Sequence, residues 1–176
     1  MKDRIVFITG ASSGIGLGCA RKFASQGASL ILNARNVTVL EDIKKELETK
    51  YATRVLLLPF DVRNRDEVAK ALTSLSQEWQ AVDVLINNAG LVIGLDKEHQ
   101  GNLDEWDVVI DTNIKGLLTV TRLLVPGMVE RGRGHIINIG SIAGDGDYPG
   151  GRVYCATKAA VTALYDGLRI DLVDTP

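Results

Sequence analysis

Thr9-Gly10-Ala11-Ser12-Ser13-Gly14-Ile15-Gly16 is a run of mostly small residues that lies between an apolar segment and an amphipathic one. The segment before it, Arg4–Thr9, is predicted as a strand, and the segment after it, Gly14–Gln26, as a helix. Small residues let the backbone turn tightly, and the first turn of a helix offers free N–H groups and a partial positive charge. A glycine-rich loop alone can be a structural turn, but its place between strand and helix predicts a pyrophosphate site.

Short apolar runs and longer amphipathic segments alternate along the whole chain. We expect strands at Arg4–Thr9, Ser29–Asn33, Arg54–Phe60, Val82–Asn87 and His135–Ile139, and helices at Gly14–Gln26, Val37–Tyr51, Arg65–Glu78, Leu103–Arg131 and Val153–Val173. The strands are nearly continuous in apolar residues, which is typical of strands covered on both faces. This alternation predicts an α/β fold, a doubly wound parallel sheet with helices on both faces. The loops Gly90–Gly101 and Gly140–Gly151 follow strands, so we expect them at the edge where such folds bind ligands.

Composition narrows the class of protein. The 176 residues fit a single domain, 1–176, and a formal net charge of −2 argues against a nucleic-acid partner, which requires clustered basic residues. No apolar stretch is long enough to cross a bilayer, and no signal peptide is visible. The two cysteines have neither metal-ligand spacing nor a disulfide framework. We therefore expect a cytoplasmic protein with no membrane partner and no bound metal.

The end of the second predicted strand distinguishes the two nicotinamide cofactors. An NAD site needs an acid there to accept the ribose 2′-hydroxyl, whereas the 2′-phosphate of NADP is repelled by an acid and bound by an arginine. The sequence has Asn33-Ala34-Arg35-Asn36, with no acid. Arg35 can pair with the phosphate and stack on the adenine, although surface arginines are also common at such edges. We therefore predict NADP, with Arg35 and Asn36 among its binding residues.

Tyr154 and Lys158 are four residues apart in the last predicted helix, and therefore on one face of it. A free phenol is a poor base at neutral pH, but a nearby ammonium stabilises the phenolate. Tyr154 can then take the proton of a substrate hydroxyl during oxidation, or return it during reduction. Ser141, at the end of the fifth predicted strand, can hydrogen-bond the substrate oxygen as charge develops there. A tyrosine and a lysine at this spacing are common, so the assignment depends on the order and context of all three residues.

Taken in order, these segments resemble the short-chain dehydrogenase/reductase superfamily, whose members are Rossmann-type enzymes. Gly10-x-x-x-Gly14-x-Gly16 is similar to the family's nucleotide loop, Asp61-Val62 to its adenine contact, and Asn87-Asn88-Ala89-Gly90 to its NNAG motif. The resemblance implies a catalytic tetrad of Asn113, Ser141, Tyr154 and Lys158. In it, Asn113 helps to organise a water leading to Lys158, which also holds the nicotinamide ribose, while Ser141 and Tyr154 contact the substrate. The cofactor contacts that it implies are Gly10, Ser12, Ser13, Gly14, Ile15, Gly16, Asp61, Val62, Asn88, Ala89, Gly90, Tyr154 and Lys158.

Four stretches resemble one branch of this superfamily, the NADP-dependent 3-hydroxy acid dehydrogenases. They are Asn87–Gly94, Val125–Arg131, Gly134–Ser141 and Tyr148–Tyr154. The resemblance implies hydride transfer between NADP and the CH–OH group of a small 3-hydroxy acid such as serine or 3-hydroxypropionate. A general carbonyl or 3-oxoacyl reductase shares the tetrad and is an alternative, and a non-catalytic NADP-binding protein is another. Arg152 is either an attractor of a substrate carboxylate or a solvated residue at the rim.

Members of the family continue past the last helix predicted here with another strand, a proline-glycine turn, a substrate loop and a final strand. We therefore expect this chain to be C-terminally incomplete and to lack the family's substrate-loop region. The resemblance also implies a homo-oligomer, a tetramer whose contacts use the last two long helices and the final strand.

Overall fold

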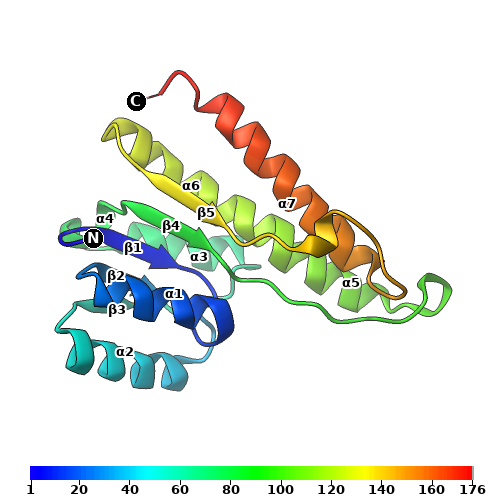
Figure 1. The fold of residues 1–176 in the computed structure, drawn as a ribbon, viewed down its shortest axis with the longest axis horizontal. Coiled ribbons are helices and arrows are strands. Elements are labelled where there is room, and N and C mark those ends of the chain that lie inside the picture. The colour runs from blue at the N-terminus through cyan, green and yellow to red at the C-terminus, as the bar shows by residue number, and fades with distance from the viewer. Residues whose placement is uncertain (176) are drawn as a thin grey trace.

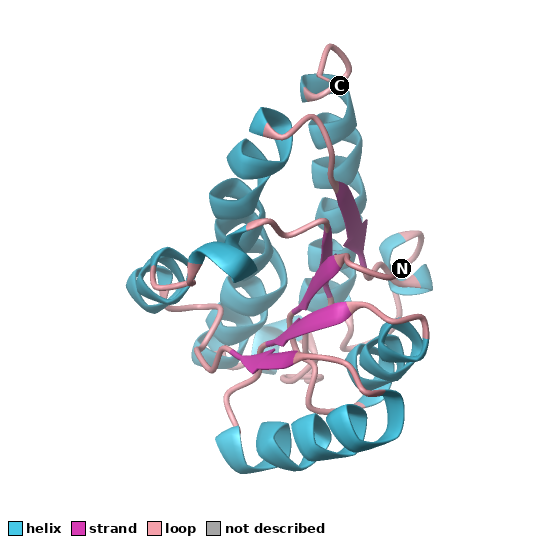
Figure 2. Cartoon of the chain, turned by 90° about the vertical axis from the view of Figure 1, so that its left-hand side faces the viewer, coloured by secondary structure: helices cyan, strands magenta, loops and turns pink. Residues whose placement is uncertain are grey.

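The computed structural model describes residues 1–175 as one parallel sheet with helices packed on both faces (Figures 1 and 2). The strands are β1 (Ile5–Ile8), β2 (Ser29–Leu32), β3 (Val55–Leu57), β4 (Val84–Asn87) and β5 (His135–Asn138). They lie in the order β3-β2-β1-β4-β5, and each neighbouring pair is parallel. The predicted α/β fold with a doubly wound sheet is confirmed.

Seven α-helices and three shorter helical segments connect the strands in the described part of the chain. The α-helices are α1 (Gly14–Ser25), α2 (Val37–Tyr51), α3 (Arg65–Thr73), α4 (Gln77–Gln80), α5 (Leu103–Ile110), α6 (Leu117–Glu130) and α7 (Arg152–Asp171). The shorter segments are the 3-10 helix η1 (Glu98–Gln100), the π-helix η2 (Asp111–Gly116) and the 3-10 helix η3 (Ile142–Gly144). Within residues 1–175, none of these helices combines the length and the apolar character that crossing a membrane would need.

Strand β1 shows why the sheet is buried on both faces. Its side chains point alternately to opposite faces, as they must in a pleated strand. Val6 and Ile8 pack in the core that α1 and α2 cover, whereas Ile5 and Phe7 pack in the core under α3 and α6. All four side chains are buried. A strand between two layers of helices is therefore apolar at every position.

One predicted helix is in two pieces. We expected a single helix over Arg65–Glu78, but α3 ends at Thr73 and α4 begins at Gln77. The hydroxyls of Thr73 and Ser74 donate to backbone carbonyls of the preceding turn, which is how such side chains compete with helix continuation. The prediction of one continuous helix was wrong because it weighed apolar spacing and not these local hydrogen bonds.

The long helix predicted over Leu103–Arg131 contains a wider turn in its middle. Helix α5 passes into η2 and then into α6 without a break in the helical path, and η2 has the geometry of a π-helix. Gly116 lies against Val62 in this turn, and an added Cβ would be 2.8 Å from the Val62 Cγ2. The wider turn places Thr112 and Asn113 in buried positions. Single π-turns inside helices are frequently found at functional sites.

Strand β5 departs from the prediction that every strand is covered on both faces. His135 is exposed, and Ile136, Ile137 and Asn138 are only partly buried. In the described residues β5 pairs with β4 on one side only. Helix α7 packs against α5, η2 and η3. The prediction of full burial was wrong for β5, since its apolar residues do not reveal whether another strand adjoins it.

The strands all end at one edge of the sheet, to the right in Figure 1, and long loops project from that edge. The order of the strands reverses between β1 and β4, because β2 and β3 lie on one side of β1 while β4 and β5 lie on the other. In open α/β sheets, ligands bind in the crevice outside the carboxyl ends at this switch point.

Candidate active site

The glycine-rich loop after β1 is held against the loop after β4. Gly10 and Gly14 have φ angles of 63° and 53°, which side chains other than glycine rarely adopt. The Asn88 amide donates to the carbonyls of Thr9 and Gly10 at 3.0 and 2.9 Å, and the Thr9 hydroxyl accepts the backbone N–H groups of Asn88 and Ala89 at 3.0 Å each. The NNAG segment thus fixes the shape of the nucleotide loop.

A cavity of about 610 Å³ opens between these loops. Most of the predicted site residues line it: Gly10, Ser12, Ser13, Gly14, Ile15, Arg35, Asp61, Val62, Asn88, Ala89, Gly90, Ser141, Tyr154 and Lys158. The structure thereby brings most of the predicted nucleotide-binding residues and three of the four predicted catalytic residues, Ser141, Tyr154 and Lys158, into a single cavity.

Three predicted residues are absent from the lining of this cavity. Gly16 is buried beneath the loop, where a Cβ would collide with the Gly10 carbonyl and the Asn88 amide. Asn36 caps α2, and its side chain accepts the N–H of Val39 at 3.2 Å. Asn113 lies behind the loop that follows Gly90. Gly16 and Asn113 support the cavity from behind, and Asn36 holds the helix that follows Arg35.

The loop and helix α1 fit a dinucleotide pyrophosphate. Ser13 precedes α1, and its side chain makes no capping hydrogen bond. The backbone N–H groups of the first turn therefore remain available to an anion. A Cβ on Gly14 would meet nothing within 4 Å, so the space above the loop is open. Free backbone N–H groups and open space above the loop are what the pyrophosphate of NADP requires.

An exposed arginine that follows β2 lies at one end of the cavity. The Arg35 side chain is 67% exposed, and its guanidinium is 4.0 Å from the carboxylate of Asp61. Asp61 is held more closely by Arg63, whose guanidinium nitrogens lie 2.6 to 3.0 Å from it. Hydrogen bonding from Arg63, with a smaller contribution from the Arg35 charge, lowers the pKa of Asp61. Because Arg63 satisfies this carboxylate, Arg35 is left available for another anion.

Lys158 and Tyr154 lie together at the catalytic end. The Lys158 ammonium is 5.8 Å from the centroid of the Tyr154 ring and donates to the Ile139 carbonyl at 2.8 Å. The Lys158 side chain is buried, and burial lowers the pKa of its ammonium. An ammonium in a partly dry site stabilises a nearby phenolate more strongly than one in water.

Ser141 enters the same cavity from the loop after β5. Its hydroxyl accepts the N–H of Ala143 at 3.1 Å, which fixes the side chain at the start of η3. Helix α7 packs directly against η3, and a Cβ on Gly144 would come within 3.0 Å of the Lys158 backbone. The close packing of these two elements sets Ser141 beside Tyr154 and Lys158.

Asn113 ties the catalytic helix to the loop after β4. Its side-chain amide accepts the N–H of Leu91 at 2.9 Å and donates to the Leu91 carbonyl at 3.0 Å. It also donates to the Thr157 hydroxyl at 3.0 Å, and this hydroxyl donates to the Tyr154 carbonyl at 2.7 Å. Asn113 therefore connects three segments of the site through hydrogen bonds that the sequence did not predict.

Thr157 is a residue of the site that the sequence analysis missed. It is 1% exposed and sits between Tyr154 and Lys158 on the catalytic helix. The only sequence signal was a β-branched hydroxyl residue inside the Tyr154–Lys158 segment, since such a residue in a helix needs a partner for its hydroxyl. Asn113 and Tyr154 supply the two partners, so Thr157 is a positioning residue for both.

The fold and the cavity define a class of protein, the dinucleotide-dependent oxidoreductases with a doubly wound α/β sheet. The nucleotide loop, the switch-point cavity and the Tyr154–Lys158 pair all belong to that class. The family model described as short chain dehydrogenase matches residues 4–175. The chain belongs to the short-chain dehydrogenase family.

Individual relatives agree with this assignment. The NADP-dependent 3-hydroxy acid dehydrogenase YdfG of Salmonella typhi is 47% identical over 171 residues, which cover 97% of this chain and 67% of that protein. The crystal structure of serine dehydrogenase from Escherichia coli has a TM-score of 0.92 and 45% identity, covering 97% of this chain and 77% of that one. The closed form of serine dehydrogenase complexed with NADP+ has a TM-score of 0.90 and 44% identity, over 97% and 67% of the two chains. The chain thus spans about two thirds of the length of the curated relative that it matches.

Proposed function

We propose that this protein is an NADP-dependent oxidoreductase that transfers a hydride between NADP and the CH–OH group of a small 3-hydroxy acid. The observation that carries the proposal is a single cavity with Arg35 at one end and Ser141, Tyr154 and Lys158 at the other. Relatives with 43% to 47% identity bear the name NADP-dependent 3-hydroxy acid dehydrogenase, which supports the substrate class. A carbonyl or 3-oxoacyl reductase shares the same cavity and is the alternative.

The proposed binding residues fall into three groups, one for each part of the cofactor. The backbone of Gly10–Gly14 and the first turn of α1 hold the pyrophosphate. Arg35 would bind the 2′-phosphate, and Asp61 and Val62 would contact the adenine. Asn88, Ala89 and Gly90 line the path toward the nicotinamide ribose, where Lys158 binds. NADP supplies the hydride acceptor in oxidation and the hydride donor in reduction.

The side chains of the chain itself handle the proton. In oxidation Tyr154 accepts the proton of the substrate hydroxyl while a hydride leaves the carbon that carries this hydroxyl. The Lys158 ammonium stabilises the Tyr154 phenolate, and the Ser141 hydroxyl donates a hydrogen bond to the substrate oxygen. In reduction Tyr154 returns the proton to the oxygen. Asn113 acts through Leu91 and Thr157, and we infer that it also helps to supply a water to Lys158.

The Tyr154→Phe variant tests the proposal. We expect it to bind NADP as the wild type does and to lose activity by about 10²- to 10⁴-fold, the usual contribution of a general acid or base. Tyr51→Phe, at the end of α2 and outside the cavity lining, is the matched control and should keep full activity. Turnover of 3-hydroxy acids by Tyr154→Phe at the wild-type rate would contradict the catalytic role. Reduction of 3-oxoacyl thioesters without any oxidation of hydroxy acids would favour the alternative.

The number of subunits and the location of the protein in the cell are further parts of the proposal. We propose a homo-tetramer that works in the cytoplasm, with one NADP-binding catalytic domain in each subunit. Leu118 and Leu123 on α6, and Tyr165 and Ile170 on α7, are large apolar side chains that are exposed in the single chain, which supports contacts between subunits through these helices. Sedimentation of the purified protein measures the number of subunits directly.

A further inference from the structure

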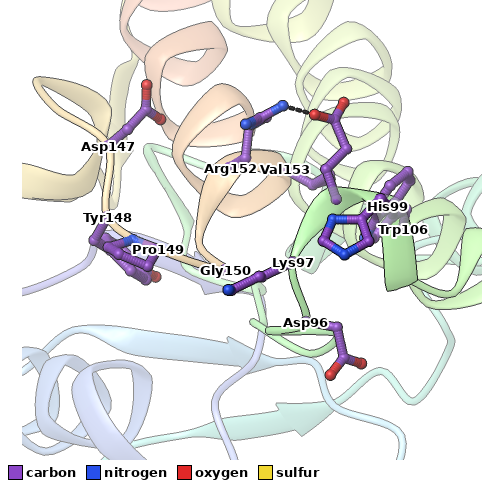
Figure 3. Close-up of a pocket in the computed structure, with 11 residues that line it drawn as sticks. Asp96, Lys97, His99, Trp106, Asp147, Tyr148, Pro149, Gly150, Arg152 and Val153 are labelled. Carbon is purple, nitrogen blue, oxygen red and sulfur yellow. Dashed lines mark ion pairs between the residues drawn. The ribbon is translucent and has the colours of Figure 1, made fainter.

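A second cavity, of about 730 Å³, lies between the two long loops at the carboxyl edge of the sheet (Figure 3). One wall comes from residues 96–99 with Trp106, and the other from residues 147–153. The two loops touch through their backbones, because a Cβ on Gly150 would collide with the Leu95 carbonyl. Gly150 has a φ of 78°, so the chain uses a glycine where this close approach requires one. The cavity is therefore bounded by two loops that are packed together.

This outer cavity adjoins the catalytic residues. Val153 lines it, and the next residue, Tyr154, lines the cofactor cavity. Tyr148 forms part of its wall and lies against Gly151. Gly151 comes directly before α7 and three residues before Tyr154, so the Tyr148 ring packs at the start of the helix that carries Tyr154. A small molecule at Tyr154 therefore has the outer cavity beside it.

The cofactor cavity offers a hydroxy acid no free cation for its carboxylate. Its lining contains two cations in the described chain, Arg35 and Lys158. Arg35 lies at the adenosine end beside Asp61, and the Lys158 ammonium is committed to the Ile139 carbonyl and to Tyr154. A carboxylate left without a cation in a partly dry site would be strongly disfavoured. Among the described residues, a cation for it has to come from outside this cavity.

The outer cavity contains an arginine that already binds a carboxylate. The Arg152 guanidinium forms an ion pair with Glu98 of the opposite loop, drawn as a dashed line in Figure 3. Both side chains are largely exposed, at 66% and 57%, so exchanging one carboxylate for another costs little. The planar fork of a guanidinium matches a carboxylate through two hydrogen bonds, which the ammonium of Lys97 cannot do. Arg152 also lies in the first turn of α7 and lines the outer cavity together with Val153, the residue before Tyr154.

We propose that Arg152 is the residue that determines specificity for acidic substrates, and that it exchanges Glu98 for the carboxylate of the hydroxy acid. This inference rests on the proposed function, because it assigns a partner to the substrate of that reaction. Glu98 keeps the guanidinium paired until substrate arrives and competes with the substrate for it. Removing Arg152 and removing Glu98 therefore have opposite effects on the binding of a hydroxy acid.

The test compares two substrates that differ only in charge, 3-hydroxypropanoate and its methyl ester, with NADP as the acceptor. Arg152→Gln is expected to raise KM for the acid by about two- to fivefold, the usual value of an exposed ion pair, and to leave KM for the ester and both kcat values unchanged. Glu98→Gln is expected to lower KM for the acid. Arg169→Gln is the matched control, an exposed arginine at the other end of α7 that pairs with Asp166, and it should change neither substrate.

The outcomes separate this inference from the proposed function. If the wild type oxidises both substrates and Arg152→Gln weakens both equally or neither, the carboxylate does not bind Arg152 and the inference fails alone. If Glu98→Gln raises KM for the acid, the exchange of carboxylates is excluded. If the wild type binds NADP but oxidises neither substrate, the proposed function fails and the inference fails with it.

Discussion

The two sides of the switch point between β1 and β4 differ in how completely the chain covers them. In β2 the side chains of Leu30, Ile31 and Leu32 are 0% exposed, whereas every residue of β5 is exposed or only partly buried. The nucleotide loop belongs to the covered side, and Ser141, Tyr154 and Lys158 belong to the side of β5 and α7. The nucleotide loop therefore follows a strand in a fully buried part of the sheet, while Ser141 follows a strand that is only partly buried.

The difference shows how the site is assembled. On the covered side, the loop of Gly10, Gly14 and Gly16 packs between β1 and α1, and its main distant partner is Asn88 from the loop after β4. On the β5 side, the positions of Tyr154 and Lys158 depend on contacts with distant segments, η3, Asn113 and the Ile139 carbonyl. Perturbing each side separately tests whether the two are independent.

The largest expected effect is on stability. It comes from replacing an isoleucine with alanine in β2 on one side and in β5 on the other. Ile31→Ala removes a fully buried side chain from β2 and should lower the free energy of unfolding by about 2–5 kcal/mol. Ile137→Ala removes a partly buried side chain from β5, so it should cost about half of that or less. Unfolding by denaturant, followed by circular dichroism, measures both values.

Equal losses of unfolding free energy in Ile31→Ala and Ile137→Ala would contradict the difference between the two sides, because they would mean that β5 is covered in solution. Where Ile31→Ala does not fold, the two valine variants give the same test at about 0.5–1.5 kcal/mol for the buried position.

Much of this arrangement was predictable from the sequence, because its signals are local. The α/β fold follows from alternating segments, and Gly10–Gly16 and the Tyr154–Lys158 spacing are each contained within one loop or one helix. What escaped prediction depends on contacts between distant residues. The π-turn at Asp111–Gly116 packs against Val62, and Thr157 matters through Asn113, which is 44 residues away. Neither partner is visible from the segment alone.

A smaller effect is expected at the cofactor end, on the choice between NADP and NAD. Arg35→Ala should weaken NADP binding by roughly 10- to 100-fold, because a charged contact to the 2′-phosphate is lost, and should leave NAD binding almost unchanged. Arg63→Ala is the companion variant. It frees the Asp61 carboxylate to pair with Arg35, so we expect a weaker loss of NADP affinity. Titration of each variant with the two cofactors, followed by protein fluorescence, measures both.

Equal losses of NADP and NAD affinity in Arg35→Ala would assign Arg35 to the adenine ring and not to the 2′-phosphate. The covered side would then bind the two cofactors alike, and the preference for NADP would need another residue.

The smallest effect is expected from the hydrogen bonds that join the two sides. Thr157→Val keeps the volume of the side chain but leaves the Asn113 amide and the Tyr154 carbonyl without their partner. Because one buried hydrogen-bonding group left unpaired costs about 1–3 kcal/mol, we expect kcat to fall by about tenfold with little change in the affinity for NADP. The pH profile of kcat should shift as well, since Thr157 positions Tyr154, which takes the proton.

Thr157→Ser separates a positioning role from a purely structural one. Serine restores the hydroxyl without the methyl group, so a rescue of kcat and of the pH profile would assign the effect to the hydrogen bonds. If Thr157→Val lowers the unfolding free energy but leaves kcat and its pH profile as they are in the wild type, Thr157 only packs the helix. In that case Asn113 holds the loop at Leu91 without any influence on Tyr154, and the two sides of the molecule work independently.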